Sequence, residues 1–169
     1  MKYIIMMFTT ATFLLAGCQY ESPLTKEHSI AVDPAVLGVW ELIQEKDGKP
    51  HQDERMMILK YSDTEYLVHY PIGGNDEAYY RGYLIKIAGL SCVQLQILGT
   101  DDGPLQKDEK DRFLVASYRL TGGQLEIKTL NTDLVDDDLK TTDQLRKAFL
   151  KHKDNKELFR NPGVFRKIK

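Results

Sequence analysis

Cysteine is nearly absent from this 169-residue sequence, which excludes a disulfide framework and argues against a zinc site. The two cysteines are Cys18 and Cys92, and the four histidines share no metal-ligand spacing with each other or with Cys92. Glycine-rich phosphate loops, nucleophile elbows and calcium-loop patterns are also missing, so the acidic run 136–138 is interpreted as an exposed loop. We therefore expect a protein that is not an enzyme and that holds neither a metal nor a cofactor.

A strong charge of either sign is absent as well. The formal net charge at pH 7 is −2, so the sequence does not have the excess of basic residues that is typical of nucleic-acid-binding proteins. Beyond the first residues, no apolar run approaches the roughly 20 residues that a transmembrane helix requires. The length that remains fits one domain with a single hydrophobic core.

The first eighteen residues carry the clearest motif in the chain. Lys2 precedes an uncharged, mostly apolar run of about 13 residues, which is too short to span a bilayer and is typical of a secretory signal. The run ends in Leu15-Ala16-Gly17-Cys18, which resembles the bacterial lipobox. The resemblance implies that residues 1–17 are removed and that Cys18 carries the lipid anchor. Gln19 follows where inner-membrane retention signals have Asp, so the resemblance implies an outer-membrane location facing the periplasm.

The rest of the chain divides into a tether and one domain. Residues 18–33 are polar, contain a proline and show no sustained period, so we interpret them as a lipidated tether. Residues 34–169 form the domain, in which short apolar runs rich in β-branched and aromatic residues alternate with turn residues. The expected strands are 38–45, 55–61, 65–70, 77–87, 91–98, 112–120 and 124–130, with 164–169 as an eighth.

The alternation within these runs predicts the sheet type. Val93, Leu95 and Ile97 lie on one face of their strand and the intervening residues on the other, as in a sheet with one buried face. Short connections favour an antiparallel up-and-down meander. One helix is predicted before the last strand, because Thr141 and Gln144 form a capping box and an apolar stripe that includes Phe149 follows at helical spacing.

The first strand contains Gly38-Val39-Trp40, and Gly-x-Trp at the start of an up-and-down sheet resembles the first-strand motif of the lipocalins. The resemblance implies a calycin-type barrel or half-barrel in which Trp40 closes one end. It also implies that an arginine of a late strand packs over the tryptophan, with Arg166 the first candidate and Arg119 the second. Because the helix is expected before the last strand, both a closed barrel and a half-barrel covered by the helix remain open.

Aromatic residues give the only indication of a binding site. Tyrosines on the concave face of a sheet can line an apolar pocket and offer hydroxyl groups to a ligand. The candidate ligand-binding residues are Tyr66, Tyr70, Tyr79, Tyr83 and Tyr118. Two functions follow: an interaction module that contacts another envelope protein, which we favour, or a carrier or sensor of a small apolar ligand. A filled interior favours the first, and an open cavity of several hundred Å³ favours the second.

Overall fold

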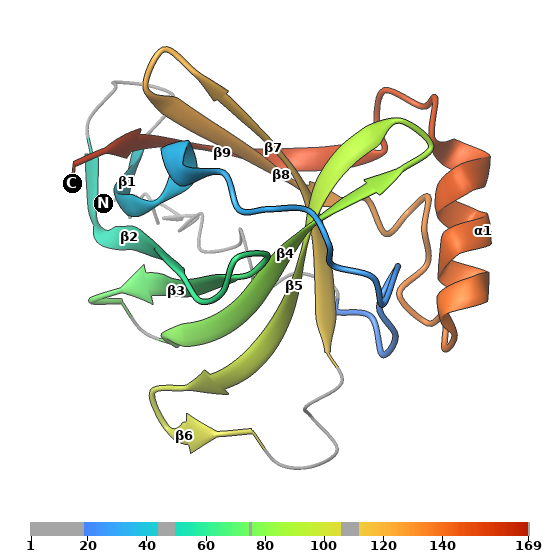
Figure 1. Ribbon diagram of the computed structural model, residues 1–169, viewed down its shortest axis with the longest axis horizontal. Coiled ribbons are helices and arrows are strands. Elements are labelled where there is room, and N and C mark those ends of the chain that lie inside the picture. Colours follow the sequence, from blue (N-terminus) through green and yellow to red (C-terminus); the bar gives the residue numbers. More distant parts are fainter. Residues whose placement is uncertain (1–18, 44–49, 75, 106–111, 169) are drawn as a thin grey trace, which may run out of the picture.

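The computed structural model describes residues 19–43, 50–74, 76–105 and 112–168, and these form a closed β-barrel with one α-helix on its outside (Figure 1). A single 3₁₀ turn, η1 (Pro34–Val36), precedes the first strand. The strands are β1 (Gly38–Ile43), β2 (Pro50–Lys60), β3 (Tyr66–Ile72), β4 (Ala78–Ile87), β5 (Leu90–Thr100), β6 (Gly103–Pro104), β7 (Phe113–Thr121), β8 (Gln124–Leu130) and β9 (Phe159–Lys167). The helix α1 (Thr142–His152) lies between β8 and β9.

Eight antiparallel strands close the barrel, and the short strand β6 only extends β5 into a hairpin. The order around the barrel is β1-β2-β3-β4-β5-β7-β8-β9, and β9 returns to β1 with Glu41 opposite Arg166. The meander, the strand count and the helix before the last strand confirm the sequence prediction. Closure excludes the half-barrel, and the result is consistent with a lipocalin-like fold.

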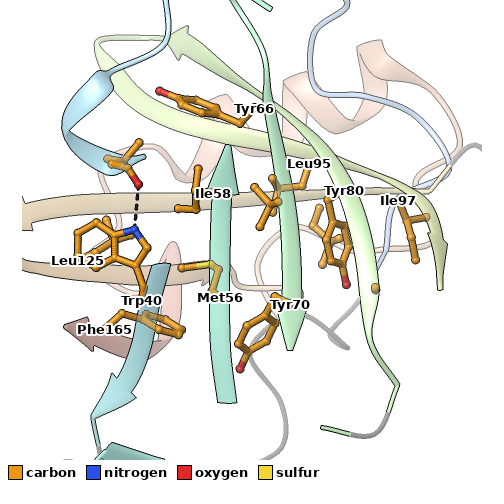
Figure 2. Close-up of a cluster of buried hydrophobic side chains, with 14 residues drawn as sticks. Trp40, Met56, Ile58, Tyr66, Tyr70, Tyr80, Leu95, Ile97, Leu125 and Phe165 are labelled. Carbon is orange, nitrogen blue, oxygen red and sulfur yellow. Dashed lines mark hydrogen bonds between the residues drawn. The ribbon is translucent and has the colours of Figure 1, made fainter. Parts of the chain in front are cut away.

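The barrel interior is filled by side chains from every wall strand (Figure 2). Trp40 is fully buried, and its indole N–H donates a hydrogen bond of 2.9 Å to the carbonyl oxygen of Val36 in η1. Gly38 has φ of +134°, a conformation that side chains disfavour, and it turns the chain from η1 into β1. The predicted role of Trp40 as a core residue is confirmed, with η1 lying beside it.

A second hydrophobic core lies outside the barrel, between α1 and the outer wall of β4, β5 and β7. Both halves of the predicted capping box at Thr141 and Gln144 are present. Leu145 and Phe149 have no exposed surface, and burying each such side chain contributes about 1.5–3 kcal/mol. Cys92 on β5 is also buried here, and burial raises the pKa of its thiol to about 12. It is a packed structural residue.

The last strand begins earlier than the sequence predicts. This strand was expected over residues 164–169, yet the turn residues Asn161, Pro162 and Gly163 already lie inside β9. The register with β8 shifts between Ile127 and Thr129, and Asn161 has φ of +54°, so the chain absorbs the turn residues as an irregularity within the strand. A prediction from turn residues alone misses this, because a bulge and a loop use the same residue types.

Candidate functional site

The barrel interior leaves almost no free space. Its cavity measures about 60 Å³ and is lined almost entirely by apolar side-chain atoms. Small-molecule sites usually enclose about 300–1,000 Å³. Leu95 contributes to the filling, and a Cβ on Gly82 would approach its side chain within 2.7 Å. The described interior therefore matches a packed core better than a ligand chamber.

The five candidate tyrosines do not converge on one site. Tyr66, Tyr70 and Tyr118 project into the barrel, whereas Tyr79 and Tyr83 lie on the outer wall. Tyr79 stacks on His69 with ring centroids 4.2 Å apart. Tyr79 and Tyr83 share a face because side chains of a strand alternate, and that face is the outer one.

Two buried polar groups meet near one end of the interior. The Tyr70 hydroxyl donates a hydrogen bond of 3.2 Å to Glu54, and both residues are buried. Burial, followed by the charge of Glu54, raises the pKa of Tyr70 above its usual value. Burial also raises the pKa of the neighbouring Tyr80 to about 12. Both phenols therefore remain protonated at physiological pH, and that of Tyr70 acts as a hydrogen-bond donor.

Lys167, and not the predicted Arg166, lies over the Trp40 ring. Arg166 points to the outer face, where its Nε lies 3.0 Å from the carboxylate of Glu41. The amine of Lys167 instead lies 5.3 Å from the centre of the indole ring. Lys167 is paired with Trp40 in the register and shares a face of β9 with the buried Phe165, so alternation directs Arg166 away. Arg119 pairs with Glu126 on β8. The prediction for Arg166 is therefore corrected.

A larger hollow than the interior cavity lies outside the barrel. This outer cleft has a volume of about 790 Å³ and is bounded by the N-terminal segment, by β4, β5 and β7, and by the start of α1. Its lining includes Glu21, Lys26, His28, Arg81, Tyr83, Gln96, Lys140, Thr142 and Asp143. Its size fits a small ligand or a segment of a partner protein, and its lining is polar and of mixed charge.

The N-terminal segment that forms one wall of the cleft is tightly docked. We call residues 20–25 the strap. Tyr20 is 1% exposed and exchanges two backbone hydrogen bonds of 2.8 Å with Phe113. The pairing of β7 with β8 does not extend to Phe113, so Tyr20 lies beside β7 where β8 is no longer paired with it. Its hydroxyl donates to the carbonyl oxygen of Val135 at 2.8 Å. The segment expected to act as a tether therefore contacts the domain from Gln19 onward.

Gln94 holds the middle of the strap. Its side chain is fully buried on the outer face of β5, and its amide oxygen accepts hydrogen bonds from the backbone of Leu24 at 2.7 Å and Thr25 at 3.3 Å. Its amide nitrogen donates to the Thr25 carbonyl oxygen at 3.2 Å and to the Tyr83 hydroxyl. One glutamine thus satisfies the backbone polar groups at Leu24 and Thr25, where the strap covers an apolar wall.

A charged cluster borders the same cleft. Glu65 is buried and accepts two hydrogen bonds from Arg81, one from Nε at 2.8 Å, while His28 lies 3.5 Å away. Burial opposes ionisation of Glu65, but Arg81, Ser62 and His28 together keep its pKa below the usual carboxyl value. Arg81 is about one-third exposed and faces the cleft as a positioned cation.

A smaller groove of about 280 Å³ lies near the end of α1. Its lining carries more positive than negative groups, from Arg119, Lys128, Lys153 and Lys156 against Glu126. Lys128 and then Arg119 pair with Glu126 and lower its pKa. Part of the positive charge is therefore already neutralised by the protein.

Neither a metal centre nor a membrane-spanning helix is found among the described residues. Within these ranges, no three histidine, cysteine, aspartate or glutamate side chains are grouped as a metal site. The helix of the described chain is too short and too polar to cross a bilayer. Cys18, the predicted lipidation site, lies outside the described residues.

No family model, curated protein or solved structure matches this chain. The sequence alone did not predict the strap, the role of Gln94 or the Glu65–Arg81 pair. Only Leu24 and Tyr20, two large apolar residues in a polar segment, could have indicated docking.

Proposed function

We propose that this protein is a lipoprotein of the bacterial envelope that is anchored through Cys18 and contacts a partner protein through the outer cleft. In this proposal it is not an enzyme. It lies on the outer membrane facing the periplasm, and its barrel is a packed scaffold that carries the cleft.

The anchor is supported by the lipobox-like sequence Leu15-Ala16-Gly17-Cys18 and by the short apolar run before it. Each buried methylene of an acyl chain contributes about 0.8 kcal/mol, so a multiply acylated Cys18 would hold the protein on the membrane stably. Replacement of Cys18 by alanine should abolish acyl labelling. The product should be an uncut precursor or a soluble protein, and normal fractionation with normal labelling would refute the anchor.

The interaction function is supported by one contrast between two cavities. The interior offers about 60 Å³, whereas the outer cleft offers about 790 Å³. An apolar cargo would need the interior, and a polar partner surface fits the cleft, where Arg81 and Lys26 lie with Asp143. This contrast favours partner binding over carriage of a small apolar ligand.

The test compares two exposed lysines. A photo-crosslinking residue at position 26, in the cleft, should capture a defined envelope partner in cells, and the same residue at position 147, on the outer side of α1, should not. Lys26→Glu should weaken that capture while the matched Lys147→Glu leaves it unchanged. Equal capture at both positions would refute the cleft as the contact. Native mass spectrometry that finds a co-purified apolar molecule would favour the carrier instead.

A further inference from the structure

Only a very short stretch of chain links the docked strap to the predicted anchor. Tyr20 is buried and paired with Phe113, and Cys18 precedes it by two residues. An extended chain spans at most about 3.3–3.6 Å per residue, so the Cα atoms of Cys18 and Tyr20 are separated by no more than about 7 Å. A lipid-bound Cys18 therefore brings the wall around Tyr20 to the membrane surface.

This position defines a near end and a far end of the barrel. Phe113 begins β7, and the β7–β8 turn at Gly122-Gly123 lies at its other end (Figure 1). At about 3.3 Å per residue, the eight steps from Phe113 to Thr121 separate the two ends by about 26 Å. The near end can touch lipid headgroups while the far end projects away from them.

The near end presents one exposed apolar and one exposed cationic residue. Leu98 on β5 is 41% exposed, and Arg112 is also exposed, with its backbone carbonyl oxygen accepting a hydrogen bond of 3.2 Å from the backbone of Ile97, which precedes Leu98. Arg112 also donates to the side chain of Gln19 at 3.3 Å, next to the predicted anchor. An exposed leucine suits the boundary between headgroups and acyl chains, and a guanidinium pairs with phosphate.

Acidic groups at this end limit where the contact can lie. Asp101 and Asp102 are exposed in the turn between β5 and β6, and an anionic lipid surface would repel them. The favourable contact is therefore on the side of the wall that carries Leu98 and Arg112.

We propose that the surface formed by Gln19, Leu98 and Arg112 lies directly on the phospholipid headgroup layer, so that the short link to Cys18 holds the barrel in one orientation. This inference rests on the proposed lipid anchor. The β7–β8 turn then points away from the membrane.

The experiment uses the full lipidated protein, purified from membranes and reconstituted into phosphatidylethanolamine–phosphatidylglycerol vesicles. Leu98→Cys receives an environment-sensitive fluorophore, and Gln124→Cys, an exposed strand position at the far end, is the matched control. The native Cys92 is buried and does not compete for the label. Phospholipid brominated near the headgroup should cause loss of most of the fluorescence at position 98 and little loss at position 124. Equal quenching at the two positions would overturn the proposed orientation.

A spacer isolates the effect of the short link. About ten Gly and Ser residues inserted between Cys18 and Gln19 add a reach of roughly 18 Å and leave the strap sequence intact. We expect the quenching at position 98 to fall toward that at position 124, with no change in melting temperature. Undiminished quenching would refute the short link as the cause of the orientation.

The outcomes separate this inference from the proposed anchor. A protein that carries no acyl group and does not co-sediment with vesicles contradicts the anchor itself. A protein that is acylated and vesicle-bound, yet equally quenched at both positions, contradicts only the orientation.

Discussion

Replacing Gln94 by alanine should release the strap from the barrel. The four hydrogen bonds of this buried amide include a contact of 2.7 Å to the Leu24 N–H and a short contact to the Tyr83 hydroxyl. Each such bond contributes about 0.5–1.5 kcal/mol, and a buried partner left without one costs about 1–3 kcal/mol. Release of the strap offsets part of this free-energy loss, because the freed polar groups then form hydrogen bonds with water.

We therefore expect the free energy of unfolding to fall by about 2–4 kcal/mol, the sum of the lost bonds less that rehydration. For a domain of this size, the change lowers the melting temperature by roughly 5–15 °C. The released strap should also become sensitive to trypsin at Lys26, because proteolysis requires local opening of the chain. Circular dichroism and mass spectrometry of limited digests, on the detergent-solubilised full chain, measure the two effects.

The control is Gln124→Ala, which removes an exposed glutamine from a strand outside the strap site. It should melt within about 0.5 kcal/mol of the wild type, as surface substitutions usually do. If Gln94→Ala melts like this control and Lys26 stays protected, the strap is not held by Gln94 and the reasoning is wrong.

Three further predictions address the two cores and the buried ionisable groups. Trp40→Ala should cost about 3–5 kcal/mol in chemical denaturation, and water-like tryptophan emission in the native wild type would contradict its burial. Phe149→Asp should sharply lower the melting temperature and expose dye-binding surface, and an unchanged melt would exclude α1 from the outer core. Because the pKa of Glu65 is lowered in the folded state, its stabilisation is present above the ordinary carboxyl pKa and is lost as pH falls through the lowered value. The stability difference between wild type and Glu65→Gln should therefore shrink on acidification, and a constant difference would refute this linkage.

The sequence predicted the elements whose signals are local. The alternation of Val93, Leu95 and Ile97 identified a strand and the face of it that lines the barrel, and the capping box at Thr141 marked the start of the helix. These patterns depend on neighbours along the chain, so tertiary context did not overturn them. Barrel closure was left open because it depends on pairing between the first strand and the last.

The site depended on contacts that local patterns do not encode. Gln94 alternates with apolar residues and therefore looks solvent-facing, yet the strap and α1 cover the outer wall where it lies. Tyr79 and Tyr83 were grouped with the interior tyrosines because composition does not distinguish the two faces of a strand. Arg166 was misassigned for a similar reason, since a shift of one residue along β9 exchanges the inside and outside of the barrel.

The pairing of β1 with β9 also sets the order of events during folding. Glu41 and Arg166 are 125 positions apart, so the seam of the barrel forms only after nearly the whole domain has been synthesised. Until then β1 and β8 each present an unpaired strand edge, the kind of surface that promotes association between chains. Contacts of such long sequence separation also slow folding, because the loop between them must close first. The interval between synthesis of β1 and closure of the barrel is therefore the period in which this protein is most exposed to aggregation.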